Sequence, residues 1–320
     1  MKEFSGKIAV VTGGGTGMGR SLVRQLVEEG CHVATCDIID ENLNETLAIA
    51  TDEAPQGVKV TIHRCDVASE DDVARFKNEV MEQHDTSHTN LLFNNAGIAG
   101  GGSFVNSTRE EWERTFDICW GGVYLMTRTF LPLLLNSDEG HIINTSSVNG
   151  FWASLSGNTP HTAYSSAKFA VKGFTEALIN DFRVNAPHLK ASVVMPGHVG
   201  TEIAVNTGRV LGSTQPGQLS DDDVKAIRNR WAKERTGVEE LSDDQIREML
   251  QLQLEQQQQA FREGGLTSDQ AATIILEAVK RDEWRILVGE DAEALDRVIR
   301  RNPLNTYDKD LERMVRDELG

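Results

Sequence analysis

The sequence predicts an α/β fold, a doubly wound parallel sheet of about seven strands with helices on both faces. Two observations support this prediction. Short apolar runs of strand length alternate with longer amphipathic stretches over most of the chain. The first apolar run is also followed directly by a glycine-rich loop and a helical pattern, which is the context of a nucleotide-binding turn.

The apolar runs predict the strands in chain order, at residues 7–12, 32–37, 58–64, 90–93, 141–145, 190–195 and 284–288. Helical patterns fill the intervals between them. The first ends near Gly30, a long one covers about 109–135 with a weak point at Gly121-Gly122, and another runs from Tyr164 to about Asn185.

Residues 203–265 interrupt this alternation before the last strand, because they are polar, poor in strand patterns and helical. Three capping signals accompany them: Ser220-x-x-Asp223, Ser242-x-x-Gln245 and Thr267-x-x-Gln270. Two interpretations stay open, a helical lid over a substrate pocket or an added oligomer contact or surface ornament. After a helix at 268–281 and the last strand, we expect two helices within 290–320, near 291–301 and 307–318. The whole chain, 1–320, is expected to form a single domain.

Composition and charge exclude several functions. The net charge of −17 argues against binding to nucleic acid or to an anionic membrane surface. No apolar run approaches the ~18 residues of a membrane span, since Arg128 and Pro132 interrupt the most apolar stretch. The four cysteines form no Cys-x-x-Cys pair and no zinc spacing with histidine, so we expect no metal. With no signal peptide expected before the first strand, the prediction is a cytoplasmic protein.

A tyrosine and a lysine, Tyr164 and Lys168, are the candidate catalytic pair. Four residues apart on a helix, they lie on one face. A free phenol has a pKa of about 10, and a nearby ammonium favours the phenolate and lowers that pKa. With the Ser147 hydroxyl beside them, they suit proton transfer to or from an alcohol or carbonyl oxygen. Alone the motif is weak, because an exposed helix face with a solvated lysine has the same spacing.

The glycine-rich loop, Gly13-Gly14-Gly15-Thr16-Gly17-Met18-Gly19, is the candidate dinucleotide site. Its glycines let a pyrophosphate approach, and the following helix offers free N–H groups. Asp37, at the end of the second strand, can bond both ribose hydroxyls of adenosine and would repel a 2′-phosphate, which favours NAD over NADP. The alternatives are a plain glycine turn and an aspartate that caps the next helix.

Polar and glycine residues follow three later strands. Asp66, ahead of Val67, is expected to bond the adenine amino group or to cap the helix from Ser69. Asn94-Asn95-Ala96-Gly97 follows the fourth strand and is expected to hold the crevice in which the cofactor lies. The sixth strand ends in Pro196-Gly197-His198-Val199-Gly200-Thr201.

In this order, the motifs resemble the short-chain dehydrogenase/reductase family in its common cytosolic, NAD-preferring form, a Rossmann-like fold. They are Thr12-Gly-x-x-x-Gly17-x-Gly19, Asp37, Asp66-Val67, Asn94-Asn-Ala-Gly97, Ser147, Tyr164-x-x-x-Lys168 and Pro196-Gly-x-Val-x-Thr201. The resemblance covers about residues 7–201 and is extended by the helix–strand unit at 267–289.

The resemblance implies a role for each position. Tyr164 is the acid/base, Lys168 lowers its pKa and binds the nicotinamide ribose, and Ser147 steadies the substrate oxygen. It also implies a homodimer or homotetramer. The residues implied in cofactor binding are Gly13, Gly17 and Gly19 at the pyrophosphate, Asp37 at the adenosine ribose, Asp66 and Val67 at adenine, Asn94 near the ribose linkage, Val199 and Thr201 at the carboxamide, and in addition Thr16, Met18, Ala96, Gly97, Tyr164, Lys168, Pro196 and Gly197.

Two departures from the family pattern matter. The family often has asparagine in an Asn-x-x-Gly pattern in the long helix, where it holds a water leading to the lysine. Here Cys119 stands three residues before Gly122, and a thiol is a weak donor and acceptor. The interval between Ser147 and Tyr164 is also longer than usual, with the excess in 150–163.

The expected substrate contacts come from the loop 150–163 and the region from Ile203. The residues expected near the pocket are Asn149, Phe151, Trp152, His161, Met195 and His198. Their aromatic and sulfur side chains suit a bulky, apolar substrate, although plain core packing is the alternative for each. The predicted function is hydride transfer between NAD(H) and a bulky, apolar secondary alcohol or ketone. The alternative is a catalytically weak NAD-binding sensor or scaffold, with Cys119 as the sign of a lost proton path.

Overall fold

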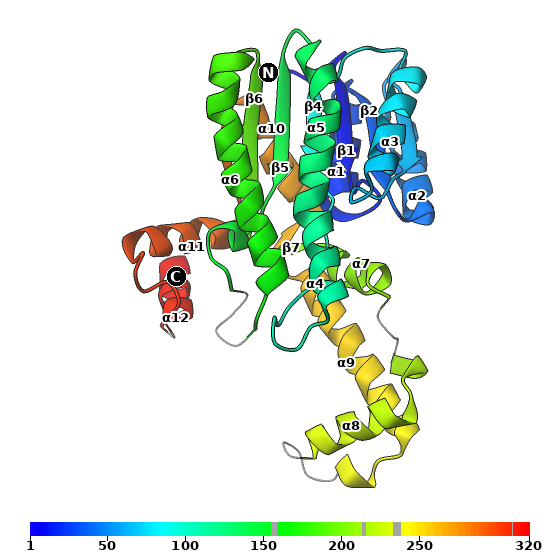
Figure 1. Cartoon of the computed structure of the whole chain (residues 1–320), viewed down its shortest axis with the longest axis vertical. Helices are drawn as coiled ribbons and strands as arrows, with labels where there is room; N and C mark the ends of the chain where they lie inside the picture. Colours follow the sequence, from blue (N-terminus) through cyan, green and yellow to red (C-terminus); the bar gives the residue numbers. More distant parts are fainter. Residues whose placement is uncertain (155–158, 213–215, 233–237, 309) are drawn as a thin grey trace.

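The computed structural model describes residues 1–154, 159–212, 216–232, 238–308 and 310–320 (Figure 1). Parts of three predicted segments, the long loop 150–163, the insertion 203–265 and the helix near 307–318, therefore lie outside the described residues, namely 155–158, 213–215, 233–237 and 309.

A parallel sheet of seven strands forms the centre of the molecule, in the order β3-β2-β1-β4-β5-β6-β9. All six pairings are parallel. Strands β2 and β3 are added on one side of β1 and strands β4, β5, β6 and β9 on the other, which is the strand order of a doubly wound sheet. The predicted fold class is confirmed. The strands are β1 (Ile8–Thr12), β2 (His32–Asp37), β3 (Val60–Arg64), β4 (Leu91–Asn94), β5 (Gly140–Thr145), β6 (Leu189–Pro196) and β9 (Arg285–Val288).

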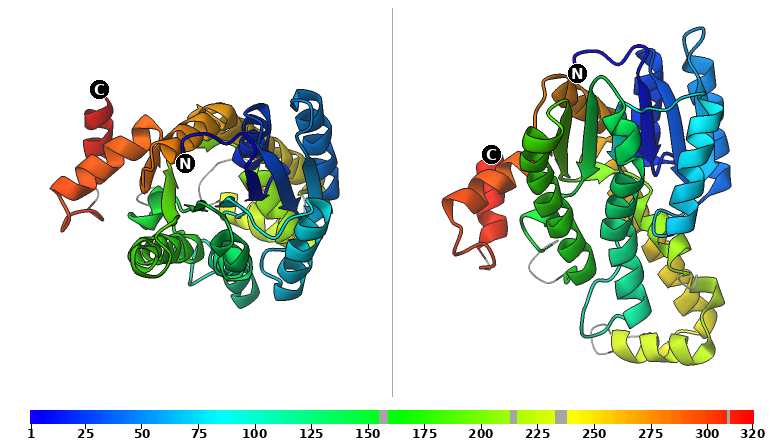
Figure 2. Two further views of the ribbon diagram at one scale, coloured as in Figure 1. Left: turned by 90° about the horizontal axis from the view of Figure 1, so that it is seen from above. Right: turned by 45° about the horizontal axis from the view of Figure 1, so that its top comes forward.

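Helices cover both faces of this sheet (Figure 2). Successive side chains of β1 show why: Ala9 and Val11 pack on one layer of helices, whereas Val10 packs on the other. The first layer is α1 (Gly17–Glu28), α2 (Asp40–Glu53) and α10 (Ser268–Lys280); the second is α3 (Glu70–Gln83), α5 (Gly122–Leu135) and α6 (Thr162–Asn185), with α4 (Arg109–Phe116) ahead of α5.

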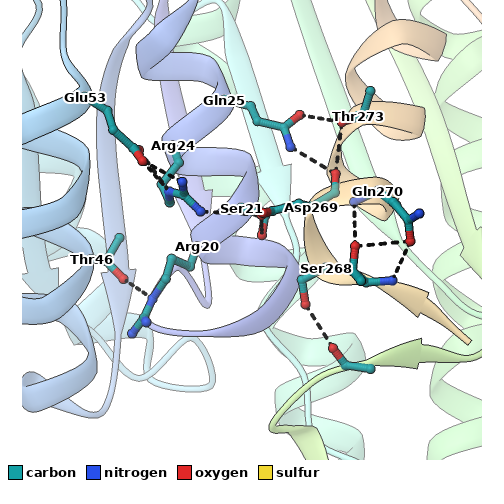
Figure 3. A network of polar contacts seen from close by, with 12 residues as sticks. Arg20, Ser21, Arg24, Gln25, Thr46, Glu53, Ser268, Asp269, Gln270 and Thr273 are labelled. Atoms are coloured by element: carbon teal, nitrogen blue, oxygen red, sulfur yellow. Dashed lines mark hydrogen bonds and ion pairs between the residues drawn. The ribbon is translucent and has the colours of Figure 1, made fainter. Parts of the chain in front are cut away.

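A polar seam joins α1 to α10 (Figure 3). The Ser21 hydroxyl donates to the Asp269 carboxylate at 2.5 Å, and the Thr273 hydroxyl donates to Gln25 at 3.0 Å. At the other end of the seam, the Ser268 hydroxyl donates to the Gly200 carbonyl at 3.1 Å. These bonds hold α1 against α10, and the N-terminal end of α10 against the segment that follows β6.

The long helix predicted at 109–135 contains a π-helical turn, Asp117–Gly121, between α4 and α5. The weak point therefore lies just before Gly122 and contains Cys119. The helix continues through Pro132. Its length and its mean hydropathy would be sufficient to cross a bilayer, whereas the sequence analysis expected no membrane-spanning segment because it found no uninterrupted apolar run of sufficient length. Half of its most apolar window is buried, and it packs against α3 and β4 as a core helix does.

The insertion is helical in its described residues, as predicted. It contains α7 (Ile203–Val210), α8 (Asp221–Trp231) and α9 (Asp243–Glu263), with short 3-10 turns at Pro216–Gln218 and Val238–Glu240. The Ser242–Gln245 and Thr267–Gln270 capping boxes both form, and the Ser220 hydroxyl accepts the Asp223 N–H. Two short strands that the sequence did not predict, β7 (Val199–Gly200) and β8 (Leu266–Thr267), pair where the insertion leaves and rejoins the body.

The outer part of the insertion projects away from the sheet (Figure 1). There α8 and α9 enclose an apolar cluster of their own, built on Val224, Trp231, Val238 and Ile246. The chain closes with α11 (Glu290–Arg301) and α12 (Leu311–Leu319), which pack on each other beside the end of β9. The second of these begins a few residues later than predicted.

Candidate active site

A crevice opens at the carboxyl ends of β1 and β4, and the glycine loop forms its floor. Gly13 has φ +67°, and a Cβ there would lie 2.8 Å from the Ala96 Cα. A Cβ at Gly19 would overlap the Gly13 carbonyl. Thr16, the N-cap of α1, makes no side-chain cap bond, so the first N–H groups of the helix stay available to a phosphate.

The carboxylate of Asp37 is held at the wall of this crevice by three backbone N–H groups. One oxygen accepts from Gly15 at 3.0 Å, and the other accepts from Ile38 at 2.7 Å and Ile39 at 3.2 Å. Burial raises the pKa of the carboxyl, while these bonds oppose the rise. Asp37 therefore accepts hydrogen bonds from the glycine loop and from the turn that leads into α2, whose N-cap is Ile39. Its side chain also lines the crevice.

At the far end of the crevice lie Asp66 and Val67. One Asp66 oxygen accepts from the Ala68 N–H at 3.0 Å, and the other pairs with Arg114 at 2.6 Å. The cap of α3 is Ser69 rather than Asp66. Asp66 is therefore not the helix cap that one interpretation expected, and it remains in the lining of the crevice.

The two adjacent asparagines after β4 have different places. Asn94 is buried, donates to Thr127 at 3.0 Å and to Asn144 at 2.8 Å, and lines neither cavity. Asn95 lines both, and its amide donates to the Thr12 carbonyl at 3.1 Å. Because successive side chains of an extended chain face opposite ways, only one of the pair reaches the crevice. The sequence analysis selected Asn94 and missed Asn95.

Ser147, Tyr164 and Lys168 lie on one larger cavity of about 720 Å³ that adjoins the crevice. The Lys168 ammonium lies 5.3 Å from the centre of the Tyr164 ring and donates to the Thr145 carbonyl at 2.8 Å. The Ser147 hydroxyl lies on the wall of the same cavity as the Tyr164 phenol and acts to lower the pKa of that phenol. Ser146 turns away and donates to the Lys168 carbonyl at 2.8 Å, which supports the choice of Ser147.

Burial dominates the electrostatics of this pair. It raises the pKa of the Tyr164 phenol, and the Ser147 hydroxyl opposes that rise. Burial also lowers the pKa of the Lys168 ammonium. We expected the ammonium to lower the pKa of the phenol; the pKa is instead raised, because burial disfavours the phenolate.

The chain matches the family described as short chain dehydrogenase over residues 7–210. The oxidoreductase SadH of Mycobacterium tuberculosis is 37% identical over 215 residues, which cover 67% of this chain and 75% of SadH. This chain belongs to the short-chain dehydrogenase/reductase family.

Two solved members of the family resemble this dehydrogenase/reductase. One from Burkholderia phymatum, in complex with NAD, gives a TM-score of 0.74 at 26% identity, with 95% of this chain and 96% of that one covered. A metagenomic short-chain oxidoreductase in complex with NADP gives 0.52 at 29% identity, covering 61% and 83%. Since these neighbours hold different dinucleotides, the choice between them depends on the residues of this chain.

Most other predicted site residues of this dehydrogenase/reductase line one of the two cavities. The residues that line the crevice are Gly13, Thr16, Gly17, Met18, Gly19, Ala96, Gly97 and Thr201. The residues that line the larger cavity are Asn149, Trp152, His161, Pro196, Gly197, His198 and Val199. Phe151 and Met195 lie outside both. Phe151 packs 5.5 Å from the Arg285 guanidinium in a cluster with the C-terminal helices, and Met195 is a core residue of β6.

His161 lies directly against Tyr164, the candidate acid/base. Its ring stacks on Tyr164 with 4.4 Å between centres and 18° between planes. Burial lowers the pKa of His161 to about 4, so the ring is neutral at physiological pH. His161 therefore fixes the Tyr164 ring by contact, without adding charge.

One wall of the larger cavity was expected only in part, because the sequence analysis placed substrate contacts in the region from Ile203 but named none of its residues and none of the C-terminal helices. This wall is formed by Ile203, Ala204, Phe261, Asp291, Leu295, Leu311, Val315 and Arg316, which come from the insertion and the C-terminal helices. No local motif marks these residues, and only the folding of those helices back onto the sheet edge brings them to the cavity. Among the described residues, no three His, Cys, Asp or Glu side chains gather in a way that could hold a metal ion.

Proposed function

We propose that this oxidoreductase interconverts a bulky, apolar secondary alcohol and its ketone with NAD(H), using Tyr164 as acid/base. One observation carries the proposal: the Ser147–Tyr164–Lys168 cavity shares Met18, Asn95, Gly97, Thr201 and Ile203 with the dinucleotide crevice. A nicotinamide that followed the crevice from the glycine loop would enter the larger cavity beside the phenol.

The residues of the chain handle the proton and the orientation. In reduction, the Tyr164 phenol donates its proton to the carbonyl oxygen, which the Ser147 hydroxyl holds by a hydrogen bond. The Lys168 ammonium beside the ring then stabilises the phenolate. When bound, NADH supplies the hydride that the carbonyl carbon accepts. Oxidation of the alcohol runs the same transfers in reverse.

Asp37 supports NAD as the cofactor. Its carboxylate lies where an adenosine ribose would meet the end of β2, and it would repel a 2′-phosphate. The nearby Arg20 is engaged, with bonds to the Gly15 carbonyl at 2.6 Å and to Glu45 at 2.7 Å. Arg114, on the wall of the crevice, is paired with Asp66.

A substrate panel tests the proposal. We expect turnover of aryl and cyclic ketones with NADH, and faster turnover than with small ketones, because Trp152, Phe261 and Leu295 give the cavity an apolar wall. The rival function, an NAD-binding sensor or scaffold, would bind NADH but reduce none of the panel. Oligomeric state and cytoplasmic location stay predictions.

Replacing Cys119 separates these two functions. Its thiol is buried and donates to the Ile98 carbonyl at 3.2 Å, in the π-helical turn beside Lys168. The Lys168 ammonium is already positioned by its hydrogen bond to the Thr145 carbonyl, so an asparagine at position 119 has little to add. We therefore expect Cys119→Asn to raise kcat by less than about tenfold, which corresponds to the free energy of one neutral hydrogen bond. Steady-state kinetics measure this, with Cys119→Ser as the matched control. A gain above about a hundredfold would mean that the natural enzyme is impaired and would favour the sensor.

We also propose that the base of the insertion closes the substrate cavity. The Phe261 ring lies 4.6 Å from that of His198, and His198 Nε2–H donates to the Phe261 carbonyl at 2.9 Å. Phe261→Ala should raise KM for a bulky ketone roughly tenfold, because apolar contact worth about 1.5–3 kcal/mol is lost, and should leave NADH affinity unchanged. Leu252→Ala, exposed on the outer part of α9, is the control. A changed subunit count with an unchanged KM would show an oligomer contact instead.

A further inference from the structure

Building on the proposed function, we infer that the substrate carries a carboxylate at the end remote from its reacting carbon, and that Arg316 of α12 binds it. The cavity is apolar over most of its wall, yet the Arg316 side chain lies at its rim and is exposed. An apolar cavity with a cation at one end fits an amphipathic substrate, with an apolar body and an anionic tail.

The position of α12 separates Arg316 from the phosphates of the dinucleotide. The glycine loop follows β1, whereas α11 and α12 follow β9, and β4, β5 and β6 lie between these two strands. Figure 1 shows α11 and α12 together at the β6–β9 side of the molecule. An anion at Arg316 is therefore part of the substrate and not the pyrophosphate of the cofactor.

The helix that carries Arg316 is docked. Leu311 is buried in a cluster with Leu295 and Val298, and Glu318 pairs with Arg297 at 2.8 Å and Arg301 at 2.7 Å. The segment before α12 is attached as well, since the Trp152 indole donates to the Thr306 carbonyl at 2.8 Å. A ligand at Arg316 would therefore have to order the arginine side chain but not the helix that carries it.

Arg316 differs from the other arginine of its helix in its partners. In the part of the chain that the structure describes, no carboxylate pairs with Arg316, whereas Arg313 on the same helix pairs with Asp310 at 3.3 Å. The carboxylate on the cavity wall, Asp291, accepts the His198 N–H at 2.7 Å and lies in the first turn of α11. A guanidinium fork binds a carboxylate through two parallel bonds, which an ester or amide cannot reproduce.

Aryl keto acids of increasing chain length, each compared with its methyl ester, test the inference. We expect the natural enzyme to prefer at least one acid over its ester by about tenfold or more in kcat/KM, the worth of a charge-assisted bond. In Arg316→Gln this ratio should fall to near one, because kcat/KM for the acid should fall while kcat/KM for the ester stays unchanged. Arg313→Gln, which changes a paired arginine on the same helix, should keep the ratio. Equal use of acid and ester by the natural enzyme, or a ratio that survives Arg316→Gln, would overturn the inference.

Binding of decanoate and decanamide, measured by calorimetry on the full chain, needs no turnover. Decanoate should bind about tenfold more weakly to Arg316→Gln, and decanamide should bind both proteins alike. Discrimination without turnover of any ketone would preserve the anion site and reject the proposed function. If ketones are turned over but the affinity for decanoate is unchanged in Arg316→Gln, the anion site is rejected and the proposed function is preserved. Equal weakening of both ligands would show a structural role for Arg316 and reject the anion site.

Discussion

Tyr164→Phe should lower kcat about 10³-fold, within the range that general acid–base catalysis contributes, and leave NADH affinity within about twofold. The phenol is the acid that faces both Ser147 and the neighbouring lysine, and the stacked His161 ring has its pKa lowered to about 4 and is a poor substitute. The ring contacts survive in phenylalanine, so the loss reflects the hydroxyl alone. Steady-state ketone reduction and fluorescence titration of NADH measure the two quantities.

A matched control for this variant is Tyr124→Phe, because Tyr124 is about half exposed on α5 and touches neither cavity. It should keep full activity. Ser147→Ala should lose less than Tyr164→Phe, since Ser147 orients the oxygen and does not supply the proton. Undiminished turnover by Tyr164→Phe would refute the assignment of the acid/base.

Asp37→Ser should reduce the preference for NAD over NADP by roughly a hundredfold or more in kcat/KM. The carboxylate accepts bonds from ribose hydroxyls, worth about 1.5–3 kcal/mol each for a charged acceptor, and repels a 2′-phosphate by about 1–4 kcal/mol at 4 Å. Serine keeps a short polar side chain and removes both effects. The measurement is kcat/KM for both dinucleotides with one ketone.

Asp37 also supports the glycine loop, so its charge must be separated from its structural bonds. Asp37→Asn is the control, because an amide oxygen can still accept the Gly15 N–H while the negative charge is gone. If the preference depends on charge, Asn and Ser should shift it in the same direction. A natural enzyme that uses NADP as well as NAD would show the ribose argument to be wrong.

Much of the fold and of the candidate site follows from local patterns. Strand and helix periodicity, the glycine loop after β1 and the spacing of Tyr164 and Lys168 are properties of neighbouring residues. The capping boxes at Ser242 and Thr267 formed for the same reason, since each needs only four consecutive residues.

Other features depend on contacts between distant segments. Which asparagine of the adjacent pair faces the crevice depends on the pairing of β4 with β1 and β5. Trp152 reaches the cavity while its neighbour Phe151 packs beneath Arg285, because the C-terminal helices cover this loop. The chemistry of Tyr164 was predicted from its neighbour four residues away, but the direction of its pKa is set by burial, which many elements create together.

The sequence by itself determined the order of the strands and helices, the dinucleotide loop and the candidate pair Tyr164 and Lys168, because these depend on interactions a few residues long, whereas the choice of Ser147 rested on the family resemblance. Only the tertiary structure decided the wall of the substrate cavity, including Phe261 and Arg316, because the insertion and the last two helices reach the sheet edge through long-range packing that no local pattern records.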